Sequence, residues 1–301
     1  KGWKDFSEKN AIANWPFVTG NLTTGPADAE LVSRHVINDV AGTGISVGFV
    51  GAITEDLRNL ITPTIVDEVK LSSIASAVNG EAAKLKSEGV DVVVALIHED
   101  MSEVVASIGA DVDVAFGGHS HVKFNNGSVS PLLAMQSIQY GEAISQVDVT
   151  VDAEGKLSFN SAVLGLGSAQ GASPAYRKDC TGAVSTNVRT IVQDARDKAA
   201  IAGAQELGYI KADFNRAWDG TGATPSGGSN RGEESTLGNL VADAQLWAVQ
   251  QTTQNEKTEL AFMNPGGLRQ DLKFGTDGLV TLKAAADVQP FANSLFTMDL
   301  T

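Results

Sequence analysis

Two histidines, His119 and His121, follow an apolar run at residues 112–116 and a pair of glycines. The run is typical of a strand that is covered on both faces. Gly117 and Gly118 allow a sharp backbone turn at the carboxyl end of that strand. If the segment stays extended, both imidazoles point to the same side, because side chains i and i+2 of a strand share a face. Two imidazoles on one face are half of a metal site.

A third histidine, His98, follows a second apolar run at residues 91–97. Ligand chemistry collects at the carboxyl ends of strands in open α/β sheets, so we expect His98 to lie beside His119 and His121. The chain has only four histidines. This grouping favours a shared metal site over three separately hydrogen-bonded imidazoles. The fourth, His35, has no such context, and we expect it to be structural or exposed.

The elements that position these histidines are those of a mixed α/β fold. A helical pattern at residues 73–88 ends at Gly89, which is typical of a C-terminal cap. A turn signal at residues 152–156 joins two strands into a hairpin. Strands that alternate with helices and then form a hairpin predict a mixed sheet with helical layers. Further strands are predicted at residues 45–51, 132–135 and 144–151.

Composition suggests that the 301 residues hold two domains. Residues 165–174 are rich in Gly, Ser and Ala, which marks a linker. Residues 184–207 carry apolar side chains at helical spacing, which predicts one long bridging helix. We therefore expect a first domain at residues 1–165, a linker and bridging helix at 166–208, and a second domain at 209–301.

Charge and hydrophobicity exclude several classes of partner. The net charge of −14 argues against nucleic acid, because its phosphates would be repelled. Small phosphate esters stay possible, since a metal or an arginine cluster overrides the global field locally. No apolar run approaches the roughly 20 residues that cross a bilayer, so no membrane span is expected. The single cysteine, Cys180, excludes an intrachain disulfide.

The second half contains a possible anion site. Residues 236–244 predict a helix with Ser235 or Thr236 as its N-cap, and Arg231 lies just upstream. A helix N-terminus and a guanidinium group both attract an anion. On spacing alone, a solvated surface arginine is the simpler interpretation of Arg231.

A glycine-rich turn follows a strand predicted at residues 259–263. Backbone N–H groups of such a turn approach a ligand closely, and Arg269 at its end can fork onto a phosphate or carboxylate. Further along, Phe291 offers an aromatic face for stacking a base, although a core position is the more common situation for phenylalanine.

Together these motifs resemble the 5′-nucleotidase family of the bacterial secreted type, whose members join a metallophosphoesterase domain to a C-terminal substrate domain. The resemblance covers nearly the whole chain. It rests on the Gly-His-Ser-His block at residues 118–121 and the Asn-x-Gly-Gly-x-Arg block at residues 264–269. It implies layered β-sheets flanked by helices, a long linker helix and a second α/β domain. It also implies metal-dependent hydrolysis of nucleotide phosphate esters.

The resemblance implies specific ligands for metal and substrate. His98 and His119 would ligate one of two divalent metal ions and His121 the other, and imidazole suits zinc, manganese or iron. Arginines would hold the phosphate of a small nucleotide, and an aromatic ring would stack on its base. The implied substrate-binding residues are Arg231, Asn264, Gly266, Gly267, Arg269, Phe291 and Asn293.

The sequence departs from the family pattern in several places. The Asp-x-His and Gly-Asn-His-Glu blocks of the family do not occur. We therefore expect the catalytic His–Asp pair upstream of Lys1, and we expect this stretch to be inactive by itself and truncated at both ends. Pro265 replaces a residue that is usually Gly and stiffens its loop.

Two alternative functions remain open. The same site could hydrolyse 2′,3′-cyclic nucleotides or UDP-sugars, or the chain could be a nucleotide- or phosphate-binding module without turnover. The resemblance implies an extracellular, periplasmic or cell-wall location, and the sequence does not predict an oligomeric state.

Overall fold

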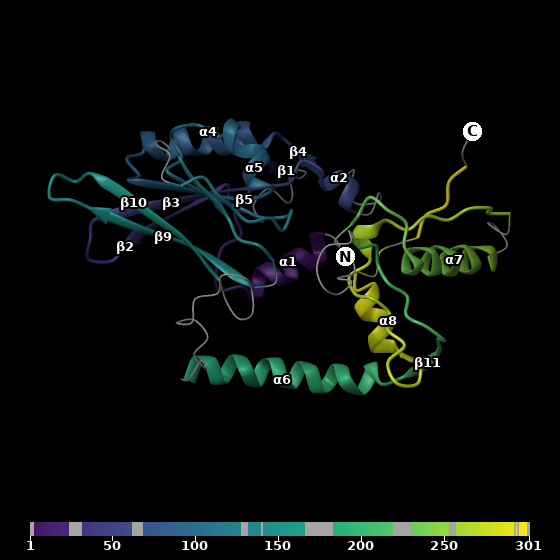
Figure 1. Cartoon of the computed structure of the whole chain (residues 1–301). Helices are drawn as coiled ribbons and strands as arrows, with labels where there is room; N and C mark the ends of the chain where they lie inside the picture. Colours follow the sequence, from purple (N-terminus) through teal and green to yellow (C-terminus); the bar gives the residue numbers. More distant parts are fainter. Residues whose placement is uncertain are drawn as a thin grey trace. The chain divides into compact units, whose positions relative to one another are not determined.

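The computed structural model describes residues 3–23, 32–61, 69–127, 132–139, 141–165, 183–218, 230–252, 257–291, 293 and 295–299. The chain divides into two compact units, residues 1–179 and 180–301. Both contain helices and strands, so the predicted mixed α/β architecture is confirmed (Figure 1). Within the described residues, no helix has the length and apolar character that crossing a bilayer requires.

The first unit is built on a six-stranded sheet with the order β2-β3-β5-β6-β8-β7. Its four central strands run parallel, and the outermost strand on each side is antiparallel to its neighbour. Parallel strands place their carboxyl ends along one edge, as the sequence predicts for the histidine-bearing segments. The strands are β2 (His35–Val40), β3 (Ile45–Ile53), β5 (Val92–His98), β6 (Val114–Gly117), β7 (Phe124–Asn125) and β8 (Leu133–Gln136).

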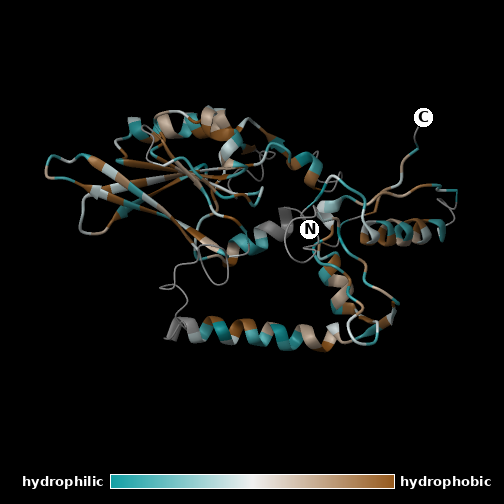
Figure 2. Cartoon of the chain, viewed as in Figure 1, coloured by the Kyte–Doolittle hydropathy of each residue, from teal (hydrophilic) through white to brown (hydrophobic). Residues whose placement is uncertain are grey.

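The sheet is covered on both faces at its centre, which explains why the central strands β5 and β6 are apolar runs. Helix α4 (Ile74–Ser87) packs on one face, where Val78 and Leu85 are fully buried. The hairpin of β9 (Ala143–Val151) and β10 (Leu157–Gly165) packs on the other face through partly buried side chains such as Phe159. Figure 2 shows the hydrophobic strands between these two layers.

Helix α4 begins and ends where the sequence predicts. The Ser73 hydroxyl accepts a hydrogen bond from the Ser76 N–H at 3.1 Å, as an N-cap does. Gly89 adopts a φ of +89° directly after the helix, and glycine reaches this left-handed conformation without strain. The other elements of the first unit are α1 (Trp3–Ile12), β1 (Leu22–Thr23), α2 (Leu57–Leu60), β4 (Lys70–Leu71), α5 (Met101–Val104) and η1 (Val105–Ser107).

The second unit has its own core, in which Leu237 of α7 and Leu268 are almost fully buried. Ser235 is the N-cap of α7, since its hydroxyl accepts a hydrogen bond from the Gly238 N–H at 3.0 Å. The elements of this unit are α6 (Ala183–Gly203), β11 (Glu206–Tyr209), α7 (Thr236–Gln250), η3 (Pro265–Gly267), β12 (Leu279–Thr281) and α8 (Leu282–Val288).

The long helix predicted in the second unit is confirmed except at its end, and one predicted strand is wrong. The helix predicted at residues 184–207 ends at Gly203, and Leu207 lies in β11, which pairs with β12. An apolar residue at helical spacing is equally compatible with a strand that starts after a turn. The strand predicted at residues 259–263 forms no ladder with any described strand.

Candidate functional site

The carboxyl ends of β5 and β6 bring two of the three predicted histidines together. His98 is the last residue of β5, and His119 lies two residues beyond the end of β6. Their ring centroids are 5.2 Å apart with an interplanar angle of 64°. The neighbouring loops are joined by a backbone hydrogen bond, in which the Gly118 N–H donates to the Glu99 carbonyl at 3.0 Å. We call His98 and His119 the imidazole pair.

The conformation of the second histidine segment differs from the prediction. His119 and His121 have φ values of +67° and +63°, so the segment is not extended, and the strand rule that places both imidazoles on one side does not apply. The turn does not depend on left-handed glycines, because Gly117 and Gly118 are absent from the positive-φ positions. Left-handed conformations are strained for residues other than glycine, and they persist only where contacts with the surrounding structure stabilise them. Such contacts must therefore stabilise this loop.

Gly117 serves close packing. A Cβ atom at this position would lie 2.6 Å from Met101 Cβ and 2.8 Å from Gln136 Oε1. Real Cβ atoms do not approach other atoms so closely, so the end of β6 requires glycine for space.

The imidazole pair carries donors suited to a metal. Desolvation is the largest cause that lowers the pKa of His98, although part of this side chain is exposed. The nearby His119 lowers the pKa further, and Glu99 opposes both effects. His98 is therefore neutral at pH 7, which is the form of imidazole that ligates a metal.

Carboxylates surround the pair on the same edge. The Thr54 hydroxyl donates to Glu99 Oε2 at 2.6 Å, which connects the end of β3 to the end of β5. Hydrogen bonds from Ser102 and Ser120 are the largest causes that hold the pKa of Asp100 below its ordinary value. Asp100 is therefore a carboxylate beside the histidine loop.

A complete metal site is not formed by the described part of the chain. No group of three or more His, Cys, Asp or Glu side chains there could hold a metal ion. The imidazole pair fits the donor chemistry of zinc or a similar ion but does not supply the three or four protein ligands of a typical site. The role of His121, which is partly buried, stays a prediction.

In the second unit, the structure places Arg231 against the glycine-rich turn. A Cβ atom on Gly266 would lie 3.5 Å from Asn264 Nδ2 and 3.7 Å from Arg231 Nη1. Gly267 is buried, and a Cβ there would lie 3.1 Å from Asn264 Oδ1. Arg231 is exposed. It is not an isolated surface arginine, because its guanidinium group and the Asn264 amide both lie beside Gly266.

Arg269 lies at the other end of this turn. Its Nη1 donates to the Gly266 carbonyl at 3.4 Å, and its Cζ lies 5.5 Å from the ring centroid of Phe291. Phe291 is 46% exposed, so it is not the ordinary core residue that the sequence left possible. Asn293 is exposed two residues further on, and its role stays a prediction.

Arg216 supports this turn and is not recognisable from the sequence pattern. Its Nη1 donates to the Arg269 carbonyl at 2.9 Å, and its Nε donates to Asp271 Oδ1 at 3.0 Å. Burial raises the pKa of Asp271, but the hydrogen bonds from Arg216 and the charges of Arg216 and Lys273 outweigh it, so the pKa lies below its ordinary value. This partly buried ion pair fixes the backbone that carries Arg269.

Comparisons with known proteins agree with this geometry. Residues 184–301 match the family described as 5′-nucleotidase, C-terminal domain. This part of the chain is similar to that family. The resemblance to 5′-nucleotidases that the sequence predicts is therefore confirmed.

Individual relatives cover more of the chain. Endonuclease YhcR of Bacillus subtilis is 26% identical over 95% of this chain and 22% of its own length. Cell wall protein Lmo0130 of Listeria monocytogenes is 24% identical over 91% of this chain and 38% of its own length. The chain thus spans well under half the length of these two relatives.

A solved structure supports the fold of both units. The 5′-nucleotidase precursor from Thermus thermophilus is similar with a TM-score of 0.69 and 22% identity, over 96% of this chain and 56% of that chain. At this identity the likeness shows the fold alone.

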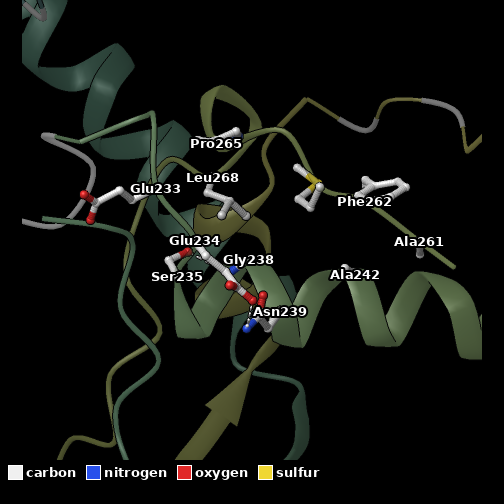
Figure 3. Close-up of a pocket in the computed structure, with 11 residues that line it drawn as sticks. Glu233, Glu234, Ser235, Gly238, Asn239, Ala242, Ala261, Phe262, Pro265 and Leu268 are labelled. Carbon is white, nitrogen blue, oxygen red and sulfur yellow. Dashed lines mark hydrogen bonds between the residues drawn. The ribbon is translucent and has the colours of Figure 1, made fainter.

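The second unit also contains a pocket beside the glycine-rich turn. Its volume is about 430 Å³. Figure 3 shows Pro265 and Leu268 on one side of it and Glu234 and Asn239 at the start of α7 on another, with the Asn239 amide donating to Glu234 Oε1 at 2.9 Å. The lining does not include Arg231, Arg269 or Phe291, so this pocket is separate from the guanidinium groups.

Proposed function

We propose that the whole protein to which this chain belongs hydrolyses phosphate esters of nucleotides, and that its 5′-nucleotidase C-terminal domain binds the nucleotide. The observation that carries the proposal is the meeting of Arg231, Asn264 and Arg269 at one glycine-rich turn, with Arg269 over the ring of Phe291. Two guanidinium groups beside an exposed aromatic ring suit a ligand that has a phosphate at one end and a base at the other.

Each residue has a distinct part in this proposal. Arg231 and Arg269 neutralise and orient the phosphate through charge-assisted hydrogen bonds. The Asn264 amide and the Gly266 N–H supply further donors, whereas the Gly267 N–H is already bonded to the Asn264 carbonyl at 3.0 Å. Phe291 provides the stacking face, with Asn293 beside it.

The imidazole pair is proposed to hold a divalent metal, zinc, manganese or iron, together with ligands outside the described residues. The resemblance implies two ions and assigns His121 to the second. A bound metal polarises a phosphoryl oxygen and activates water. The chain itself contributes the two imidazoles and the carboxylates Glu99 and Asp100, which orient the loops that carry the imidazoles.

Calorimetry with AMP tests the nucleotide site directly on this chain. Arg269→Gln is expected to weaken binding by roughly 10- to 100-fold, because a hydrogen bond between two charged groups is lost. Arg196→Gln is the matched control, since Arg196 is an exposed arginine of α6 in the same unit, and it should leave the affinity unchanged. Equal effects of the two substitutions, or adenosine binding as tightly as AMP, would contradict a phosphate site at this turn.

Chromatography of the products formed by the whole protein tests turnover, because only AMP among the substrates compared releases inorganic phosphate. AMP, a 2′,3′-cyclic nucleotide, a UDP-sugar and DNA are compared with added Mn²⁺ or Zn²⁺, and we expect hydrolysis of AMP that His119→Ala abolishes. The relative named an endonuclease makes DNA a necessary substrate to include, but a net charge of −14 disfavours a polyanion. Hydrolysis of DNA in preference to AMP would overturn the substrate class.

A binding module without turnover is the second candidate. It is favoured by the incomplete ligand set at the imidazole pair in the described residues, whereas Arg231 and Asn264 both lie at the glycine-rich turn. AMP binding that persists with a chelator, in a whole protein that converts none of the substrates to product, would support it over the hydrolase.

A location outside the cell is proposed on the resemblance to the secreted type and on the relative named a cell wall protein. Immunoblotting of culture medium, cell wall and cell lysate tests it. Protein confined to the lysate would contradict it.

A further inference from the structure

Gln136 is a fully buried polar residue at the end of β8, with 1% of its surface exposed. Its side chain bonds to the two loops that carry the imidazole pair. Oε1 accepts a hydrogen bond from the Met101 N–H at 2.8 Å, three residues after His98. Nε2 donates to the Ser120 hydroxyl at 2.9 Å, and Ser120 is the residue that follows His119.

The route of this side chain explains the space left at Gly117. Gln136 is paired with Gly117 across the sheet, and its Oε1 lies 2.8 Å from where a Gly117 Cβ would be. The amide therefore passes over the end of β6 to reach Met101, the first residue of α5, beyond it. A side chain at Gly117 would block this passage.

A hydrogen bond to Ser120 restrains the strained part of the loop after β6. It lies between His119 and His121, both of which adopt left-handed conformations that residues other than glycine seldom keep without support. The Ser120 hydroxyl bonds to Gln136, and Asp100 of the other loop also bonds to Ser120. The Ser120 side chain thus connects the strained loop to Gln136 in the sheet and to Asp100 in the loop after His98.

We propose that Gln136 is a positioning residue, whose amide holds the loops after β5 and β6 at one separation and thereby sets the approach of His98 to His119. This inference rests on the proposed function only in that the imidazole pair is taken to hold a metal. The backbone hydrogen bond between Gly118 and Glu99 is the competing explanation, and no side-chain substitution at Gln136 removes it.

Nuclear Overhauser contacts between histidine rings test the proposal on the complete chain. Only four histidines contribute signals, and rings with centroids 5.2 Å apart give a cross-peak between His98 and His119. Gln136→Met keeps much of the shape and removes both hydrogen bonds. Met135→Leu is the matched control, since Met135 is the equally buried neighbour in β8. We expect the cross-peak to be lost in Gln136→Met and retained in Met135→Leu.

Ser120→Ala is a second variant, which keeps the proposal testable if Gln136→Met does not fold. It removes only the hydroxyl at the loop end of the connection, on a residue that is exposed, and it should weaken the same cross-peak. A cross-peak of undiminished intensity in either Gln136→Met or Ser120→Ala overturns the proposal, because the Gly118–Glu99 bond then suffices.

Zinc titration separates this inference from the proposed function. If the parent chain binds zinc, Gln136→Met should weaken binding by roughly 10- to 100-fold, as loss of a residue that orients metal ligands does. If the parent chain binds no zinc and the cross-peak still depends on Gln136, the metal site fails while the positioning role stands. If zinc binds and the cross-peak is unaffected, the positioning role fails while the metal site stands.

Discussion

The ion pair of Arg216 and Asp271 gives a quantitative prediction about the glycine-rich turn. Arg216→Met removes the hydrogen bonds to Asp271 Oδ1 and to the Arg269 carbonyl, and it leaves a carboxylate whose side chain is only 12% exposed. Hydrogen bonds to charged groups contribute about 1.5–3 kcal/mol each, and breaking a buried pair costs about 3–5 kcal/mol. Because this pair is not fully buried, we expect a loss of about 2–4 kcal/mol.

Amide hydrogen exchange at Leu272 measures this loss locally. Leu272 and Phe214 exchange backbone hydrogen bonds of 2.9 and 2.8 Å directly beside the ion pair. Since about 1.4 kcal/mol corresponds to a tenfold change, protection of the Leu272 amide should fall by roughly 30- to 1,000-fold in Arg216→Met.

Lys273→Met is the control for a simple loss of charge. The Lys273 amine lies 3.6 Å from Asp271 Oδ2 and 3.3 Å from Asp213 Oδ2, but its side chain is 52% exposed. Exposed ion pairs contribute about 0–1 kcal/mol, so protection should fall by less than roughly fivefold. If Lys273→Met reduces protection as much as Arg216→Met, the argument from buried hydrogen bonds is refuted.

The pH dependence of the same pair has a definite sign. The folded-state pKa of Asp271 lies below its ordinary value of 3.8, so the carboxylate form is stabilised by folding. This contribution is fully present above pH 3.8 and is lost as the pH falls through the lower, folded-state value. The difference in protection between the parent chain and Arg216→Met should therefore be constant near neutral pH and shrink below pH 3.8. A difference that grows on acidification would contradict the assigned direction.

Two further predictions concern packing, each measured by urea denaturation of the complete chain. Gly117→Ala should destabilise the first unit by about 1–3 kcal/mol, because the new methyl group meets Met101 and Gln136, whereas Gly80→Ala on α4 has open space and should stabilise by about 0.5–1 kcal/mol. Leu237→Ala should destabilise the second unit by about 2–5 kcal/mol, because the 1% exposed side chain leaves a cavity in its core. A neutral Gly117→Ala or Leu237→Ala would show that the chain relaxes around these positions.

The sequence predicts the regular parts of the fold well because periodicity and caps are local signals. The apolar run that ends at His98 becomes β5, Gly89 closes α4, and Ser235 caps α7. The same signals fail where the apolar spacing of a helix continues into the strand that follows it. Leu207 continues the helical spacing of α6, yet the chain turns after Gly203 and places it in a strand.

The candidate sites are predictable in residue type but not in conformation. Histidines after strands and a Gly-Gly-x-Arg turn are visible in the sequence, and the structure brings His98 to His119 and Arg231 to Asn264. The left-handed backbone of His119 is not visible, because no local pattern marks it and its support comes from side chains far along the chain.

Two polar residues provide such support in the described part of the chain: Gln136 is buried and Arg216 is partly buried, and each is distant in sequence from a partner that it holds. Gln136 lies 35 residues from its partner Met101, and Arg216 lies 53 residues from the carbonyl of Arg269. A buried amide or guanidinium group is unfavourable unless its hydrogen bonds are made, so its presence marks a backbone that must stay in one place. Gln136 bonds to the loops of the imidazole pair in the first unit, and Arg216 bonds to the end of the glycine-rich turn in the second. Each unit therefore holds its own candidate site by internal contacts. Substitutions at Gln136 should leave AMP affinity unchanged, and substitutions at Arg216 should leave the His98–His119 cross-peak unchanged.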